Sequence, residues 1–545
     1  MDAITAPPVP ANEPVRAYLP GSSEAATLAA EIERLASQRV ELTMAVAGVR
    51  RMAGGQRIRV VAPHRHELVL GETAEATEDD VDAAVGAALA AAPAWRELAF
   101  DERAAIFLRA AELLTSSWRD RLNAATMLGQ SKSVQQAEID AACELADFLR
   151  YNVHFARQLI EEQPANGPGT WNRMDYRPLE GFVLAITPFN FTAIAGNLPS
   201  APALLGNVVV WKPSPTQQLA AHHTMELFEA AGLPAGVINM VTGNGSAVST
   251  AALGHRALAG IHFTGSTATF QHLWGAVGAR IGSYAAYPRL VGETGGKDFV
   301  AAHPSADPAA LVTGLVRGAF EYQGQKCSAA SRAYVPRSLW AGGVKDELIA
   351  VTESLTYGDV ADFSNFGGAV IDRRAYDRLG GVLDSLHAAP SATVLAGGKA
   401  DDSTGYFVRP TVVQSTDPGH GVFRDEYFGP VLAVHVYDDA DWEDTLSQLE
   451  SVASYALTGA VFARDQQVIA RAQSALRFAA GNFYVNDKPT GAVVGQQPFG
   501  GGRASGTNDK AGSVWNLTRW VSPRAIKETF VPATDHRHPH MGEGA

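Results

Sequence analysis

Three short apolar runs decide the fold: GNVVVWKP at 206–213, GVINMV at 236–241 and AGIHFTGS at 259–266. Turn-forming residues follow each run, and the segment 216–231 between the first two has the pattern of an amphipathic helix. Strands that alternate with helices of this length predict a parallel sheet with right-handed crossovers. Ligands of such sheets bind at the carboxyl ends of the strands, where we expect Lys212, Gly265 and Ser266.

The same alternation continues in a second unit, from RLVGE at 289–293 to about residue 484, with a helix expected over 308–322. Toward the N-terminus we expect an irregular arm over 1–20, a helix over 22–47 and a β-hairpin over 56–70. A long helical region follows, in which Asp101 is expected to cap one helix, and it ends at the breaker cluster QPANGPG at 163–169. The sequence therefore predicts an α/β protein with two units and a cleft between them.

The composition of the chain excludes several classes of protein. The 545 residues include 44 Lys and Arg against 57 Asp and Glu, a net charge of −13, which argues against a dedicated nucleic-acid binder. No apolar run approaches the roughly 18–20 residues that cross a bilayer, and the first 20 residues lack the patterns of a secretory or transit peptide. We expect a cytoplasmic protein without a metal site. We interpret the C-terminal histidines as part of a polar end (His536, His538, His540).

Cys327 is the strongest candidate for a catalytic residue. It follows an apolar helix and a glycine in YQGQKCSA at 322–329, so we expect it on a tight connection. The neighbouring ammonium of Lys326 could favour the thiolate, which is the nucleophilic form. Taken alone, a buried and inert cysteine is the alternative, and Cys143, the second of only two cysteines, fits it.

Two further polar residues follow apolar runs. Glu293 precedes the turn TGG at 294–296 and could face the cleft as a general base; a surface turn is the alternative. Asn190, in ITPFNFT at 186–192, needs a hydrogen-bond partner if it is buried. It could donate to an oxyanion, and a turn-forming asparagine is the alternative.

Seven motifs stand in a fixed order along the chain. They are PFN at 188–190, WKPS at 211–214, FTGS at 263–266, ETGGK at 293–297, GQKC at 324–327, EYFGP at 426–430 and PFGG at 498–501. With them the chain resembles the aldehyde dehydrogenase superfamily over roughly residues 50–530. Finer details resemble the branch that oxidises L-glutamate γ-semialdehyde: TPFNFTAI at 187–194, GQKCSA at 324–329 and VGQQPFGG at 494–501.

The resemblance implies a fold and a reaction. The fold has a Rossmann-like cofactor domain, an α/β catalytic domain and a small β oligomerisation flap. In the reaction, Cys327 attacks the aldehyde carbon and forms a thioester. Asn190, with the backbone N–H of Cys327, binds the oxyanion, and Glu293 activates the water that releases the acid.

NAD is the implied cofactor. Lys212 matches the family's lysine for the adenosine ribose, Glu426 matches the glutamate for the nicotinamide ribose, and Phe428 would back the ring. The other implied cofactor-binding residues are Thr187, Pro188, Phe189, Ser214, Gly265 and Ser266. Pro215 stands where some NAD-selective relatives carry a glutamate, which leaves the strictness for NAD over NADP open.

The branch implies oxidation of L-glutamate γ-semialdehyde, the open form of 1-pyrroline-5-carboxylate, to L-glutamate in proline degradation. The implied substrate-binding residues are Phe191, Ser328, Gly491, Ala492 and Phe499. Ala492 replaces a serine of some relatives, so the substrate carboxylate would depend on backbone N–H groups. Glu144 is either a longer-range partner for the substrate ammonium or a solvent-facing helix residue.

The resemblance also divides the chain. Residues 21–167 and 182–289, with part of 485–512, would form the NAD-binding domain, 290–484 the catalytic domain, and 168–181 with 513–530 the flap. The two arms of the flap are expected at 170–178 and 514–521. Because exposed strand edges need covering, at least a homodimer is expected. Contact with a separate proline dehydrogenase is a further expected partnership.

Two other functions stay open. One is an aldehyde dehydrogenase for another semialdehyde or an amino-aldehyde, although Glu293 argues against a CoA-acylating relative. The other is a cysteine hydrolase, in which Cys327 and a distant histidine would act without a nucleotide.

Overall fold

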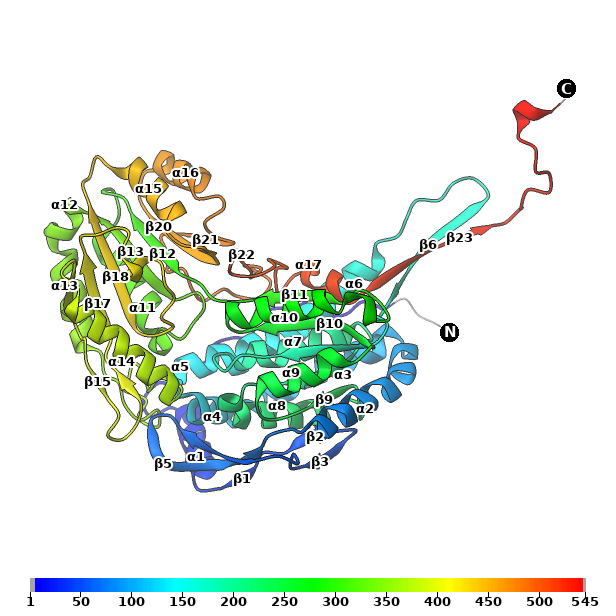
Figure 1. Cartoon of the computed structure of the whole chain (residues 1–545), viewed down its shortest axis with the longest axis horizontal. Coiled ribbons are helices and arrows are strands. Elements are labelled where there is room, and N and C mark those ends of the chain that lie inside the picture. Colours follow the sequence, from blue (N-terminus) through cyan, green and yellow to red (C-terminus); the bar gives the residue numbers. More distant parts are fainter. Residues whose placement is uncertain (1–4, 543–545) are drawn as a thin grey trace.

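The computed structural model describes residues 5–542 and has two lobes, each built on a seven-stranded sheet (Figure 1). The first sheet has the order β11 (Arg289–Glu293), β10 (Leu258–Thr264), β7 (Phe182–Ile186), β8 (Val208–Lys212), β9 (Ile238–Met240), β2 (Met44–Val46) and β3 (Val49–Arg51). Neighbours from β11 to β9 are parallel, and β2 and β3 are antiparallel additions at one edge. The parallel sheet predicted from the apolar runs is confirmed.

Helices cover this sheet, and β7, β8 and β10 are buried along their whole length. Such burial on both faces explains why these strands read as continuous apolar runs instead of alternating patterns. The crossover helices are α7 (Thr192–Leu204), α8 (Gln218–Ala230), α9 (Gly245–Gly254) and α10 (Thr267–Ala279). The preceding helices are α2 (Glu78–Glu97), α3 (Phe100–Thr115), α4 (Arg119–Gln130), α5 (Val134–Ala137), a π-helix over Glu138–Glu144 and α6 (Leu145–Glu161).

The second lobe has its own sheet and its own core. The strand order is β14 (Ala392–Ala396), β17 (Thr411–Ser415), β18 (Val431–Tyr437), β13 (Ala330–Pro336), β12 (Asp298–Ala302), β20 (Thr458–Phe462) and β21 (Asn482–Val485). All neighbours except β14 and β17 pair in parallel. The helices of this lobe are α11 (Pro308–Phe320), α12 (Arg337–Leu339), α13 (Lys345–Ser354), α14 (Arg373–Ala388), α15 (Trp442–Ser451) and α16 (Gln466–Ala475).

The N-terminal region corrects two expectations. The helix expected over 22–47 ends at Ala36, as α1 (Ser23–Ala36), and strands follow it. A small sheet then contains β1 (Val40–Glu41), β4 (Arg57–Ala62) and β5 (Arg65–Ala74), and β4 and β5 form the predicted hairpin. Asp101 is not a cap, because α3 begins one residue before it, and Glu102 instead accepts a hydrogen bond from the Ala99 N–H.

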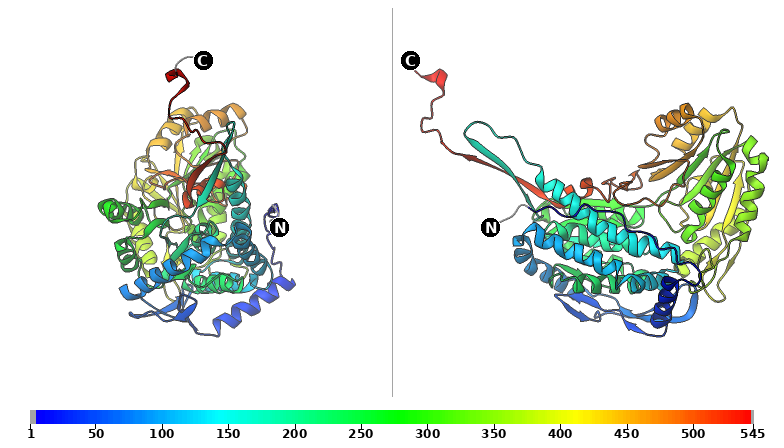
Figure 2. Two further views of the ribbon diagram at one scale, coloured as in Figure 1. Left: turned by 90° about the vertical axis from the view of Figure 1, so that its right-hand side faces the viewer. Right: turned by 180° about the vertical axis from the view of Figure 1, so that it is seen from behind.

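A two-stranded ribbon projects from the body (Figures 1 and 2). It pairs β6 (Thr170–Arg177) with β23 (Ser522–Thr529) in antiparallel register, Ser522 opposite Arg177 and Thr529 opposite Thr170. The second arm was expected at 514–521, but that segment is the short helix α17 (Val514–Leu517) and a 3-10 turn. Leu517 and Trp520 are buried there, so packing against the body holds this segment out of the ribbon.

Two further strand pairs lie in the second half of the chain. They are β15 (Ala400–Asp401) with β16 (Phe407–Val408), and β19 (Tyr455–Ala456) with β22 (Gly502–Arg503). Over residues 5–542, none of the helices combines the length and the apolar composition needed to cross a bilayer.

Candidate active site

The carboxyl ends of four parallel strands bring the sequence-predicted residues to one edge of the first sheet. Ile186 at the end of β7 pairs with Lys212 of β8 and with Phe263 of β10. Thr264 at the end of β10 pairs with Glu293 of β11. The residues that follow these positions, Thr187 and Gly265 among them, therefore lie along the same edge as Lys212 and Glu293.

Lys212 is a buried cation at this edge. Burial lowers its pKa to about 8, and within residues 5–542 no group accepts a hydrogen bond from its Nζ. Gly245, the first residue of α9, lies so close that a Cβ there would be 3.1 Å from this Nζ. A bare backbone N-terminus beside an unpaired ammonium suits a ribose hydroxyl or a phosphate oxygen, so the residues fit the adenosine end of a dinucleotide.

Three other predicted cofactor residues have side chains held by hydrogen bonds. Thr187 accepts a hydrogen bond from Trp211 Nε1 over 3.0 Å, and the Ser214 and Thr216 hydroxyls lie 3.1 Å apart. Ser266 caps α10, accepting from the Thr269 N–H over 3.2 Å. Pro188 lies half-buried in the loop after β7.

The turn before Cys327 is strained. Tyr322 and Gln323 have φ of 51° and 54°, and Gly324 follows with 64°. A non-glycine residue in this left-handed region costs roughly 1–2 kcal/mol, and such strain persists only where the surroundings hold it. Gln323 is held by hydrogen bonds from its Nε2 to the carbonyls of Ser131 and Ala369. The turn therefore fixes the start of the loop that carries the cysteine.

Cys327 is buried, and the structure corrects its expected electrostatics. Burial raises the pKa of its thiol well above the usual value, and the carboxylates of Asp298, Glu293 and Glu426 raise it further. Lys326 does not activate it, because its Nζ is paired with Glu321 Oε2 at 3.2 Å. The thiol is therefore protonated at neutral pH, and a reaction must remove its proton.

Asn190 is buried next to the same loop. Its Nδ2 donates to the carbonyl of Gln325 over 2.9 Å. An amide carries two N–H donors, so this bond fixes the side chain and leaves the second N–H for another acceptor. The hydrogen-bond partner expected for a buried Asn190 is therefore the backbone carbonyl of Gln325, two residues before Cys327.

Glu293 carries an unpartnered oxygen. Its Oε2 is buried and has no hydrogen-bond partner among residues 5–542. Burial raises the pKa of Glu293 well above the usual value, and the charge of Lys510 opposes this shift. Gly500 permits this placement, since a Cβ there would lie 2.9 Å from Glu293 Oε1. A carboxyl with a raised pKa and a free oxygen in a pocket has the properties of a general base.

Glu426 and Phe428 lie on the loop that faces these residues. Glu426 Oε1 accepts a hydrogen bond from the Gly296 N–H over 2.8 Å, and burial raises the pKa of its carboxyl. Phe428, with φ of 52°, packs edge-on against Phe189 at a centroid distance of 5.8 Å. One carboxylate oxygen of Glu426 and the Phe428 ring therefore remain for a ligand.

A cavity of about 360 Å³ brings Cys327 together with the predicted substrate residues. Cys327 and Glu293 line it together. The five predicted substrate-binding residues also line it: Phe191, Ser328, Gly491, Ala492 and Phe499. Asn190 and the predicted cofactor residues are not part of this lining. The cavity therefore meets the strand edge at Thr264 and Glu293 and does not extend along it to Lys212.

Sequence reasoning missed Lys510. Its Nζ donates to the carbonyls of Gly481 and Gly500, and its charge opposes the raised pKa of Glu293. No local pattern marks it, because its partners lie 10 and 29 residues away. Glu144 lines the cavity, and burial raises its pKa to about 8, so it is not a solvent-facing helix residue; its contact with a substrate ammonium stays a prediction.

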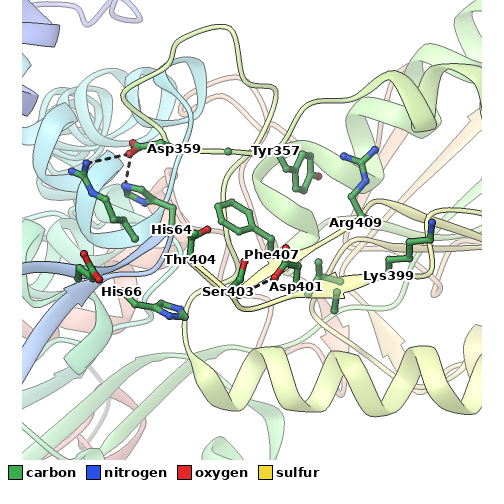
Figure 3. A pocket seen from close by; sticks show the side chains of 15 residues that line it. His64, His66, Tyr357, Asp359, Lys399, Asp401, Ser403, Thr404, Phe407 and Arg409 are labelled. Carbon is green, nitrogen blue, oxygen red and sulfur yellow. Dashed lines mark hydrogen bonds and ion pairs between the residues drawn. The ribbon is translucent and has the colours of Figure 1, made fainter.

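A larger cavity, of about 1140 Å³, lies elsewhere in the molecule (Figure 3). It is bordered by His64, Asp359, Phe407 and Arg409, and His64 Nε2 lies 3.4 Å from Asp359 Oδ1. None of the predicted site residues is among the fifteen described residues around it. Size alone would therefore misplace the active site.

Comparison with known proteins identifies the family. The aldehyde dehydrogenase family matches residues 50–526. The chain belongs to the aldehyde dehydrogenase family. A crystal structure of the delta-pyrroline-5-carboxylate dehydrogenase from Mycobacterium tuberculosis bound with NAD superimposes on this aldehyde dehydrogenase with a TM-score of 0.96 and 62% identity, covering 99% of this chain and 100% of that one.

Curated relatives of this aldehyde dehydrogenase carry the same name. The mitochondrial delta-1-pyrroline-5-carboxylate dehydrogenase of Bos taurus is 48% identical over 532 residues, 97% of this chain and 94% of its own length. The delta-1-pyrroline-5-carboxylate dehydrogenase of Agaricus bisporus is 46% identical over 540 residues, 98% of this chain and 97% of its own.

The relatives contradict the expected cytoplasmic location. The protein from Bos taurus and several other relatives are named as mitochondrial, so the expectation is wrong by this comparison. The expectation rests on the net charge, the lack of a bilayer-length apolar run and the composition of residues 1–20, and none of these features specifies a compartment.

Proposed function

We propose that this aldehyde dehydrogenase oxidises L-glutamate γ-semialdehyde to L-glutamate with NAD, the second step of proline degradation. The observation that carries the proposal is a single cavity lined by Cys327, Glu293 and the residues that match the substrate positions of this branch. The names of the relatives, and the NAD bound to the Mycobacterium tuberculosis structure, support the same reaction.

We assign the cofactor to the strand edge. Lys212, with the N-terminus of α9 beside it, would hold the adenosine ribose, while Glu426 would hold the nicotinamide ribose and Phe428 would support the ring. The remaining contacts would come from Thr187, Pro188, Phe189, Ser214, Gly265 and Ser266. When bound, NAD supplies the acceptor for the hydride that leaves the substrate carbon.

Cys327 would act as the nucleophile. Its Sγ forms a bond to the aldehyde carbon as the thiol proton passes to water, and the C=O π bond breaks so that the carbonyl oxygen becomes an oxyanion. The free N–H of Asn190 and the backbone N–H of Cys327 would donate to that oxygen, which favours the charge that develops. Loss of hydride from the carbon leaves an acyl group on the sulfur as a thioester.

Glu293 would complete the reaction. Its unpartnered Oε2 takes a proton from a water molecule, and the hydroxide formed attacks the thioester carbon. The carbon–sulfur bond then breaks, which releases the carboxylic acid and regenerates Cys327. The raised pKa of Glu293 suits this role, because a general base works best when its pKa lies close to the operating pH.

The substrate ends would be recognised by backbone and acidic groups. Gly491 and Ala492 would present N–H groups to the carboxylate, with Ser328 beside them, and the rings of Phe191 and Phe499 would flank the aliphatic chain. Glu144 would face the ammonium, whose charge lowers the raised pKa of that carboxyl.

We also propose the division into domains and a homodimer. The first sheet would bind NAD, the second would carry catalysis, and the β6–β23 ribbon would pair with a second copy. Half-exposed Trp171 on this ribbon supports the pairing, because exposed strands and large apolar side chains favour a partner. A structural neighbour named proline utilization A supports contact with a proline dehydrogenase.

The test compares wild type with Cys327→Ala, following NADH formation from L-glutamate γ-semialdehyde. We expect the variant to lose about 10⁴-fold or more in turnover, with NAD binding retained. A panel with succinate semialdehyde and amino-aldehydes fixes the substrate: the semialdehyde of glutamate should give the highest kcat/KM. If another aldehyde gave the highest kcat/KM, the substrate assignment would be wrong. If Cys327→Ala turned over near the wild-type rate, the assignment of Cys327 as the nucleophile would be wrong.

A further inference from the structure

The N-terminal arm reaches the substrate cavity. The arm, residues 5–20, runs along the side of α6 before the chain enters α1 (Figure 2). Asn12, Glu13 and Val15 of the arm line the same cavity as Cys327 and Gly491. A segment that sequence patterns mark only as irregular therefore forms part of the wall of the active site.

Asn12 joins the arm to the loop that would bind the substrate carboxylate. We call residues 487–498 the anchor loop; it includes Gly491 and Ala492 and contains neither helix nor strand. The Nδ2 of Asn12 donates to the carbonyl of Val494 over 2.8 Å, and its Oδ1 accepts from Gln496 Nε2 over 2.9 Å. The side chain therefore holds this loop from two sides.

The other end of the contact is fixed to α6. Asn12 Nδ2 also donates to Asp147 Oδ2 over 2.8 Å, and the Glu13 N–H donates to Asp147 Oδ1 over 2.7 Å. The Glu13 carboxylate lies between Arg119 at 2.6 Å and Arg150 at 2.8 Å. Since α6 is packed in the core of the first lobe, these bonds fix the position of Asn12, and through Asn12 the position of the anchor loop, relative to a rigid helix.

The anchor loop has few internal hydrogen bonds. Gln496 and Gln497 donate backbone N–H groups to the carbonyl of Val493 over 3.0 Å each, and the Val493 N–H donates to Gln497 Oε1 over 2.9 Å. The ends of the loop are held by the Thr490–Ser328 hydroxyl pair and by Asn482, which donates to the Pro498 carbonyl, so Asn12 is the contact at its middle. A loop without a ladder of backbone bonds takes its position from such external contacts. Backbone N–H groups bind a carboxylate well only when they are already in place.

We propose that Asn12 is a positioning residue that sets the affinity for the amino-acid end of the substrate by holding the anchor loop against α6. This inference rests on the proposed function, because it requires a substrate with a carboxylate. It assigns to the N-terminal arm a part in substrate selection, with no contact to the reacting carbon.

The test uses two variants from opposite sides of the contact, Asn12→Ala and Gln496→Ala. The control is Ser22→Ala, which removes the cap of α1, where Ser22 Oγ accepts from the Ala25 N–H, and does not touch the cavity. Initial rates are measured with L-glutamate γ-semialdehyde and with butanal, which lacks both the carboxylate and the ammonium. Thermal unfolding and NAD titration are recorded for every variant.

For Asn12→Ala we expect KM for the semialdehyde to rise about 5- to 20-fold, with kcat within about threefold of wild type. KM for butanal and the dissociation constant of NAD should stay unchanged. Gln496→Ala should shift KM in the same direction, and the double variant should fall short of the product of the two effects, because both side chains act on one contact.

An unchanged KM in Asn12→Ala would overturn the inference, because the contact would then have no effect on the substrate. An equal rise for butanal, or an equal rise in Ser22→Ala, would also overturn it, since either one points to general stability instead of positioning. If wild type oxidises butanal but not the semialdehyde, the proposed substrate fails and this inference falls with it. This failure of the proposed function can be told apart from a failure of the inference about Asn12, because it is seen with the wild type alone, before any variant is compared.

Discussion

The side-chain amide of Asn190 donates a hydrogen bond to the carbonyl of Gln325, two residues before Cys327. This bond connects the loop after β7 in the first lobe to the strained turn of the second lobe. It therefore ties the Asn190 amide to the segment that carries the Cys327 sulfur, although 135 residues separate the bonded pair in the chain.

Asn190→Ala should lower kcat for the semialdehyde about 100- to 1000-fold, because the oxyanion loses a fixed donor. The matched control is Asn239→Ala, which removes a buried amide that bonds to Gly236 and Ala47 in the first sheet, outside the cavity. Steady-state kinetics check this, and a similar fall in both variants would indicate lost folding instead of lost oxyanion binding.

Glu293→Ala should separate the two halves of the reaction. Acylation remains, so we expect a burst of NADH of about one per active site, followed by a steady rate about 100- to 1000-fold below wild type. Stopped-flow absorbance measures both phases, with Glu528→Ala on the exposed ribbon as the control. Absence of the burst would move the role of Glu293 to the attack by Cys327.

Alkylation of Cys327 should be slow at neutral pH without cofactor. Its thiol pKa is raised well above the usual value, so the thiolate forms only as the pH rises beyond the range of an ordinary cysteine. Iodoacetamide labelling followed by mass spectrometry should show a rate that still increases above about pH 9. Cys327→Ala reports the labelling of Cys143 alone, and a rate that levels off below pH 8 would contradict the raised pKa.

NAD affinity should depend on the charge of Lys212. Burial lowers its pKa to about 8, so the ammonium is present below that pH and is lost above it. We expect the NAD dissociation constant of wild type to rise as the pH increases past about 8. Fluorescence titration should show that Lys212→Met binds NAD about 10- to 100-fold more weakly and without this pH dependence.

Lys527→Met provides the control for that experiment, because Lys527 is exposed on β23. It should keep both the affinity and the pH profile of wild type. A Lys212→Met variant that retained the wild-type pH profile would assign the titration to another group.

Local patterns determined the parallel strands and the residues at their ends. The apolar runs at 206–213, 236–241 and 259–266 could only be buried strands between helices, and the strand geometry then placed Lys212 and Gly265 at one edge. The motifs around Cys327, Glu293 and Asn190 carried the family resemblance, and the catalytic roles that the resemblance implies for these residues stay predictions.

Tertiary structure decided what no local pattern encodes. The pKa of Cys327 rises because the thiol is buried and because Asp298, Glu293 and Glu426, from distant segments, lie near it. Its sequence neighbour Lys326 is paired with Glu321 instead. The segment 514–521 is helical because Leu517 and Trp520 are buried against the body. Asn12 reaches the anchor loop across more than 480 residues of sequence. Charge, burial and contact of this kind depend on which segments fold together, and only the folded chain brings them into range.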